Sequence, residues 1–117
     1  MILSLSAPGK YLQGKGLLNN LHMYVKDLGS KFALLADGIV YEIVEERVRE
    51  GFAGAEEAYG FIHYNGESTQ EEADRIADII QKEGYNVMIG IGGGKTLDTA
   101  KLVSNQLDIP LAIIPTV

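Results

Sequence analysis

Glycine residues gather in one turn of the sequence, within the stretch "VMIGIGGGKTLDTAK" from 87 to 101. Four of the five residues from 90 to 94 are glycine, and they follow an apolar run and precede a helix-like segment. Without side chains, backbone N–H groups can approach a ligand closely, and a helix that begins there adds positive potential. A turn of this kind is typical of phosphate binding.

The spacing of the glycines distinguishes between phosphate-binding motifs. A Walker A loop needs a glycine at position 89, where the sequence has Ile89, so a P-loop phosphotransferase is disfavoured. The fingerprint G-x-G-x-x-G fits Gly90 and Gly92 but fails at Lys95. The glycines at 92 to 94 still predict backbone amides that reach a diphosphate. The alternative is a plain strand-to-helix turn, although three consecutive glycines cost more backbone entropy than such a turn requires.

An acidic residue, Asp37, follows the strand-like run "KFALLA". A carboxylate there can accept hydrogen bonds from both hydroxyls of an adenine ribose, and it would repel a 2′-phosphate. Ligands of open α/β sheets bind at the carboxyl ends of the strands, so we expect Asp37 to meet the glycine turn at that edge. The alternative is that Asp37 and Gly38 form an ordinary Asp-Gly turn.

Strand-like and helix-like segments alternate along the chain. The strand-like segments are 10–14, 31–37, 59–64, 86–91 and 110–115, and the helix-like segments are 17–29, 41–52, 68–84 and 95–107. The alternation predicts an α/β fold, a Rossmann-like and mostly parallel sheet with helices on both faces. A capping box from Ser68 to Glu71 marks the start of the third helix, and Gly29 and Gly51 mark helix ends.

Length and composition indicate one globular domain over residues 1–117. The net charge of −6 argues against nucleic acid and against an anionic membrane as partners. The chain has no cysteine, no signal segment and no run long enough to span a bilayer, so a cytoplasmic location is expected. His22 and His63 have no partner at ligand spacing, so neither is expected to bind a metal.

Several separated segments, in order from Ala7 to Val117, match one family. "APGKYLQGKG", "LLADGIV", "GGGKTLDTAK" and "IIPTV" resemble the iron-containing (group III) polyol dehydrogenases, whose superfamily includes dehydroquinate synthase. The resemblance implies an N-terminal NAD-binding domain, followed in the complete enzyme by a helical domain that holds zinc or iron. It also implies NAD as the cofactor and a polyol as the substrate, with glycerol oxidised to dihydroxyacetone.

The resemblance assigns roles to individual residues. Asp37 would bind the adenosine ribose, Asp98 would face the ribose or nicotinamide end, and Thr116 would begin the loop on the adenine side. The diphosphate would be held by Gly93, Gly94, Lys95 and Thr96. The metal ligands of the family, an Asp and two His residues, lie in segments that this chain does not contain. We therefore expect the chain alone to be inactive; the alternative is a nucleotide-binding module without chemistry of its own.

The sequence stops at "PTV", directly after a strand-like run. A strand end at this edge normally feeds a loop and a covering helix, so we expect the chain to be part of a longer protein. Leu111, Ile113 and Ile114 would then contribute to an uncovered apolar surface, and such a surface favours self-association or a homo-oligomer.

Overall fold

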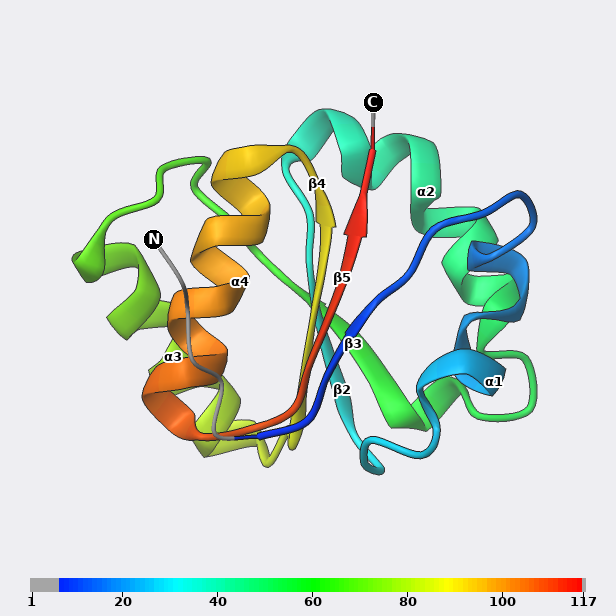
Figure 1. Ribbon diagram of the computed structural model, residues 1–117, viewed down its shortest axis with the longest axis horizontal. Coiled ribbons are helices and arrows are strands. Elements are labelled where there is room, and N and C mark those ends of the chain that lie inside the picture. Colours follow the sequence, from blue (N-terminus) through cyan, green and yellow to red (C-terminus); the bar gives the residue numbers. More distant parts are fainter. Residues whose placement is uncertain (1–6, 117) are drawn as a thin grey trace.

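Five parallel strands form the centre of the computed structural model, which describes residues 7–116. The sheet order is β1-β5-β4-β2-β3. Its strands are β1 (Gly9–Tyr11), β2 (Phe32–Leu35), β3 (Tyr59–Ile62), β4 (Val87–Gly92) and β5 (Leu111–Pro115). The helices are α1 (Leu21–Val25), α2 (Gly38–Gly51), α3 (Gln70–Glu83) and α4 (Gly94–Leu107), with 3₁₀ turns η1 (Leu18–Asn20) and η2 (Glu56–Ala58). Figure 1 shows α1 and α2 on one face of the sheet and α3 and α4 on the other, which confirms the predicted α/β architecture.

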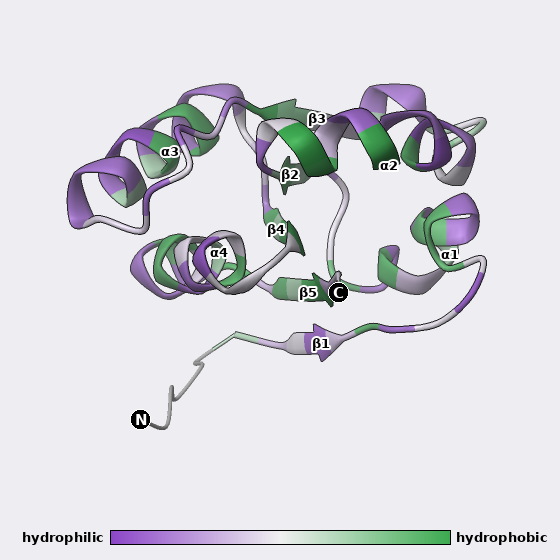
Figure 2. Ribbon diagram, turned by 90° about the horizontal axis from the view of Figure 1, so that it is seen from above, coloured by the Kyte–Doolittle hydropathy of each residue, from purple (hydrophilic) through white to green (hydrophobic). Residues whose placement is uncertain are grey.

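Side chains of the central strands alternate between two apolar layers. In β2, Phe32 and Leu34 pack with α1 and α2, whereas Ala33 and Leu35 pack with α3 and α4. Because both faces are covered, β2 and β4 are buried along their whole length. Figure 2 shows this three-layer arrangement from above, with α3 and α4 on one side of the strands and α1 and α2 on the other.

The structure corrects the predicted first helix and confirms the predicted end of the second. The segment 17–29 forms only η1 and the short α1, and the backbone leaves helical geometry at Asn20, where the two meet. Gly51 is the last residue of α2, as predicted, and a Cβ there would lie 2.1 Å from the Leu18 carbonyl oxygen. That glycine is needed because η1 crosses the helix closely.

The capping box predicted at Ser68 is wrong by one residue. Thr69 is the N-cap of α3, and its hydroxyl accepts a hydrogen bond from the Glu72 amide at 3.1 Å. The Glu72 side chain is buried against the segment after β3 instead of bonding back to the cap, which fixes the helix in this register.

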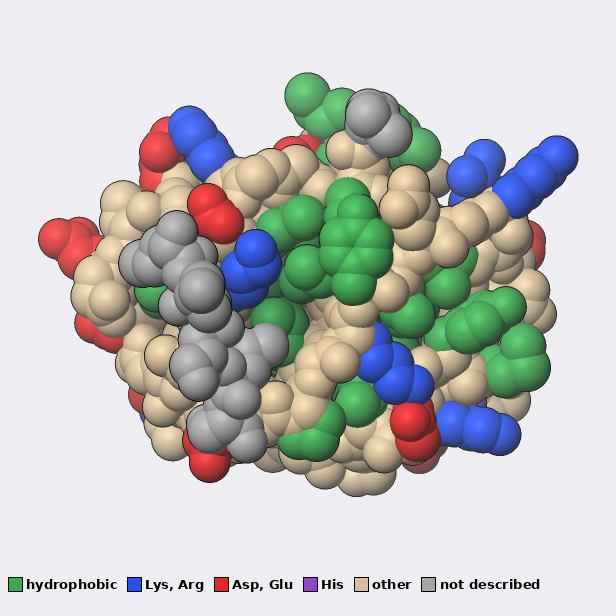
Figure 3. All heavy atoms as spheres, viewed as in Figure 1, with side chains coloured by type: hydrophobic (Ala, Val, Ile, Leu, Met, Phe, Trp, Pro, Cys, Tyr) green, Lys and Arg blue, Asp and Glu red, His purple; other side chains and the backbone are tan. Residues whose placement is uncertain are grey.

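The apolar surface expected from the last strand is also wrong in part. Leu111 and Ile114 are buried in the two core layers and Ile113 is half-buried; Val117 lies outside the described residues. Figure 3 shows hydrophobic side chains on the β1 face in patches separated by polar atoms and backbone.

No helix among residues 7–116 is both long and apolar enough to cross a membrane. Among residues 7–116, the large apolar side chains that are exposed are Tyr11, Met23, Tyr24, Ile39, Tyr41 and Ile43.

Candidate functional site

Three of the sequence-predicted segments meet at the carboxyl edge of the sheet. β2, β4 and β5 are parallel neighbours, so their ends lie side by side at the top of Figure 1. Asp37 follows β2, the glycine turn follows β4, and Thr116 follows β5. The Thr116 amide donates to the Gly92 carbonyl at 3.0 Å. The predicted meeting of Asp37 with the glycine turn at one edge is therefore observed.

The start of α4 offers backbone amides to a ligand. Gly93 is the N-cap and has no side chain to bond them, and the first amide paired within the helix is that of Leu97, which donates to the Gly93 carbonyl at 3.0 Å. The amides of Gly94, Lys95 and Thr96 come before Leu97 in the chain, so they have no carbonyl partner within the helix. A Cβ added at Gly93 or Gly94 would meet no protein atom within 4 Å. The protein itself gives no steric reason for these two glycines, whereas a ligand seated on the amides would.

The other two glycines of the turn have structural causes. A Cβ at Gly90 would lie 2.8 Å from the Ala100 Cβ, so this glycine lets α4 pack directly on β4. Gly92 has φ +147°, and a Cβ there would lie 3.2 Å from Thr96 Oγ1. The Thr96 side chain is buried beneath the turn at 2% exposure. Thr96 can therefore contribute its amide to a ligand.

Lys95 and Asp98 both lie exposed on the first two turns of α4. Lys95 Nζ lies 3.5 Å from Glu67 Oε2, and the two side chains are 68% and 67% exposed. An exposed ion pair of this kind contributes about 0–1 kcal/mol. The ammonium group can therefore leave Glu67 for a more strongly charged anion.

Asp37 is an N-cap as well as an edge residue. Its Oδ1 accepts a hydrogen bond from the Val40 amide at 2.9 Å, which starts α2. A carboxylate has lone pairs for about four hydrogen bonds, so the cap leaves acceptor capacity for a ligand hydroxyl. Asp37 can therefore cap α2 and still accept a hydrogen bond from a ribose hydroxyl.

Tyr64 is a site residue that the sequence interpretation missed, because it assigned 59–64 only as a strand-like segment. β3 ends at Ile62, and the Tyr64 side chain is buried against α4. Its hydroxyl lies 3.2 Å from the Lys95 carbonyl oxygen and 3.0 Å from Thr99 Oγ1. Burial raises the pKa of the Tyr64 hydroxyl, so the group stays protonated and can donate. Its place directly after a strand, at the ligand edge, is the signal that could have found it.

Glu72 is a second residue that the sequence interpretation missed. An acidic residue in the first turn of a helix is usually solvated, whereas the Glu72 side chain is buried. The hydrogen bond from Arg75 holds the pKa of Glu72 below its usual value, against the opposing effect of burial. The Asn65 amide adds a bond to the same carboxylate at 2.7 Å. Glu72 therefore anchors the segment that carries Tyr64.

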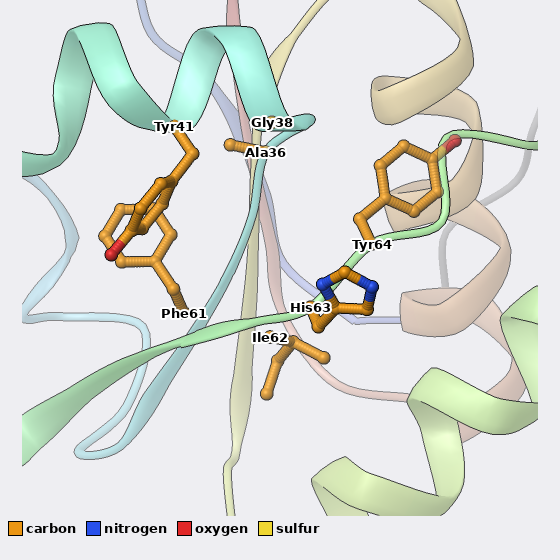
Figure 4. Close-up of a pocket in the computed structure, with 7 residues that line it drawn as sticks. All are labelled: Ala36, Gly38, Tyr41, Phe61, Ile62, His63 and Tyr64. Carbon is orange, nitrogen blue, oxygen red and sulfur yellow. The ribbon is translucent and has the colours of Figure 1, made fainter.

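An open pocket of about 280 Å³ lies beside Asp37 at the ends of β2 and β3. Figure 4 shows the Tyr41 and Phe61 rings together on one side and His63 and Tyr64 on the other. The two rings on the first side meet edge to face, with centroids 4.9 Å apart. The pocket adds apolar surface next to the carboxylate, and its lining is Ala36, Gly38, Tyr41, Phe61, Ile62, His63 and Tyr64.

The histidines lie apart from any cluster of ligands. His22 packs against Phe32 and Phe52, with ring centroids 5.9 and 5.4 Å away, and His63 is exposed at the pocket. Within the described part of the chain, no three His, Cys, Asp or Glu side chains are grouped closely enough to hold a metal ion.

Residues 8–117, which include the whole of this edge, match the model of the iron-containing alcohol dehydrogenases. The chain belongs to this family. It is 38% identical to a glycerol dehydrogenase of Pseudomonas putida over 114 residues, which are 97% of this chain and 31% of that protein. It is 36% identical to a glycolaldehyde reductase of Halobacterium salinarum over 111 residues, 95% of this chain and 30% of the relative.

The fold comparison agrees with the sequence comparison. The glycerol dehydrogenase of Schizosaccharomyces pombe superposes with a TM-score of 0.80 at 29% identity, covering 96% of this chain and 29% of that structure. The resemblance seen in the sequence motifs is thereby confirmed. The chain spans about a third of the length of the relatives it matches.

Proposed function

We propose that this chain is the NAD-binding part of a metal-dependent polyol dehydrogenase that oxidises glycerol to dihydroxyacetone. The observation that carries the proposal is the open start of α4 beside Asp37 at one edge of the sheet. The family and the glycerol dehydrogenases among the relatives support the reaction class.

The described residues fit a dinucleotide. A Cβ added at Gly93 or Gly94 would stand in open space. A diphosphate in that space would meet the amides of Gly94, Lys95 and Thr96. The Lys95 ammonium would add a charge-assisted bond. Asp37 would accept hydrogen bonds from the adenosine ribose. As the resemblance implies, Asp98 would face the ribose or nicotinamide end of the cofactor, and Thr116 would begin the loop on its adenine side.

In this proposal the chain binds and orients the cofactor, and the nicotinamide supplies the chemistry by accepting a hydride from the alcohol carbon. The negative charge of Asp37 would select NAD over NADP, because a 2′-phosphate would lie against a carboxylate. The zinc or iron of the family would be held by residues outside residues 1–117. The chain alone would therefore bind NAD without oxidising glycerol.

Titration of the isotopically labelled 117-residue chain, followed by its amide NMR signals, tests the proposal. NAD should shift the signals of residues 92–96, NADP should bind more weakly, and ATP with Mg²⁺ should not bind preferentially. Assays with glycerol, NAD and added Zn²⁺ or Fe²⁺ should form no NADH. Tighter binding of ATP–Mg²⁺ than of NAD would favour a phosphotransferase instead, and NADH formation would refute the inactivity of the chain. Self-association also stays a prediction, which sedimentation velocity would test.

A further inference from the structure

The segment that follows β3 is tied to α4 through one buried side chain. Tyr64 reaches from this segment to the first two turns of α4, where its hydroxyl meets Thr99 Oγ1 at 3.0 Å and the Lys95 carbonyl at 3.2 Å. The Thr99 hydroxyl donates to the same carbonyl at 2.8 Å. Two side-chain hydroxyls therefore converge on one backbone oxygen.

That oxygen belongs to the peptide unit whose N–H is the amide of Thr96. A peptide unit is planar, so bonds that fix the Lys95 carbonyl also fix the direction of the Thr96 N–H. Hydrogen bonds accepted by a carbonyl also polarise its own peptide unit and strengthen the N–H as a donor. This amide is one of those at the start of α4 that have no carbonyl partner within the helix.

The segment after β3, which carries Tyr64, is itself held by hydrogen bonds to α3. The buried Glu72 carboxylate accepts bonds from the Asn65 amide at 2.7 Å, from Asn65 Nδ2 at 3.0 Å, and from Arg75 Nε and Nη2 at 2.7 and 2.8 Å. Arg75 Nη2 also donates to the His63 carbonyl at 2.6 Å. The backbone is thus held on both sides of Tyr64, which leaves the Tyr64 hydroxyl little freedom to move away from α4.

We propose that Tyr64 is a positioning residue for the diphosphate of the cofactor, acting by way of Thr99 and the Lys95 carbonyl on the Thr96 amide. The inference rests on the proposed NAD-binding function. Tyr64 does not need to touch the cofactor in this role, because its hydroxyl acts on the far side of the peptide unit from the ligand. The effect should therefore be confined to ligands that carry the diphosphate.

The test compares ADP with adenosine in NMR titrations of the 117-residue chain and its Tyr64→Phe variant. The variant should bind ADP and NAD about threefold to tenfold more weakly, since it loses a hydrogen bond that orders the site. Its adenosine binding should be unchanged, and the free protein should show an altered Thr96 amide signal. Tyr85→Phe is the matched control, because Tyr85 is half-buried and lies against Gly60, far from the glycine turn.

A second pair of variants covers the case in which Tyr64→Phe does not fold. Thr99→Ser keeps a hydroxyl and should bind ADP like the unmodified chain, whereas Thr99→Val should show the same selective loss as Tyr64→Phe. Unchanged ADP binding in folded Tyr64→Phe, or equal losses for ADP and adenosine, would overturn the inference alone. Failure of the unmodified chain to bind ADP or NAD would instead overturn the proposed function itself, and the inference with it.

Discussion

The Asp37 carboxylate accepts a hydrogen bond from the Val40 amide across 2.9 Å, at the point where α2 begins beside the glycine turn. One side chain therefore caps the helix at the edge of the candidate cofactor site. The two tasks need different properties, because a cap needs an acceptor oxygen and discrimination against a 2′-phosphate needs a negative charge. Substitutions can separate them.

Asp37→Asn should keep the stability of the chain and lose its cofactor preference. Asparagine caps helices as well as aspartate does, so the free energy of unfolding in urea should stay within a few tenths of a kcal/mol. The ratio of NADP to NAD affinity should rise about tenfold, because the charge that opposes the phosphate is gone. Asp37→Ala should show the same change in preference and also lose about 1 kcal/mol of stability. If the Asn variant discriminates as strongly as the unmodified chain, the selectivity does not come from this charge.

Two glycines of the same turn should respond in opposite ways to alanine. Gly90→Ala should lower the free energy of unfolding by about 1–3 kcal/mol, because its methyl group would overlap the Ala100 side chain 2.8 Å away. Gly94→Ala should leave stability within about 1 kcal/mol, since alanine is a better helix former and nothing lies within 4 Å. NAD affinity should nevertheless fall at least about tenfold in Gly94→Ala, because the methyl group would stand where the diphosphate binds.

Urea unfolding and NAD titration of both alanine variants distinguish a ligand cradle from a plain turn. If Gly94→Ala binds NAD like the unmodified chain, the open space at that glycine is not occupied by the cofactor.

The sequence predicted the fold and the edge of the site, but it did not predict how the edge is held. Alternating apolar runs and helical periodicity are local signals, and they located the central strands and Asp37 correctly. The contacts of Tyr64 with Lys95 and Thr99 join residues more than thirty positions apart, which no local pattern reveals. Glu72 illustrates a related limit, because an acidic residue in a first helical turn reads as solvated until its contact with Asn65, outside the helix, is known.

The Glu72–Arg75 pair should make the stability of the chain depend on pH in the acid range. The Arg75 hydrogen bond lowers the pKa of Glu72 in the folded chain below its ordinary value of 4.5. The ionised carboxylate therefore stabilises the fold above about pH 4.5, and that contribution is lost as the pH falls through the lower, folded pKa. In urea unfolding, the advantage of the unmodified chain over Glu72→Gln should be largest near pH 7 and shrink below pH 4.5. Glu71→Gln, an exposed neighbour in the same helical turn, is the control for the removal of one carboxylate charge. A constant difference for Glu72→Gln at all pH values would contradict the assignment.

Lys95 and Glu67 should have opposite effects on cofactor binding, although they are partners in the free chain. Because the exposed pair is worth no more than about 1 kcal/mol, a diphosphate can take the ammonium group from Glu67, and Glu67 then acts as a weak competitor. Glu67→Gln should tighten NAD binding about twofold to fivefold, whereas Lys95→Met should weaken it about tenfold and flatten its salt dependence. Lys82→Met is the control, since Lys82 forms a comparable exposed pair with Asp78 on α3, at 2.9 Å. The gain from Glu67→Gln should vanish in the Lys95→Met background. A gain that persists there would mean that Glu67 opposes the cofactor by its own charge and not by holding Lys95.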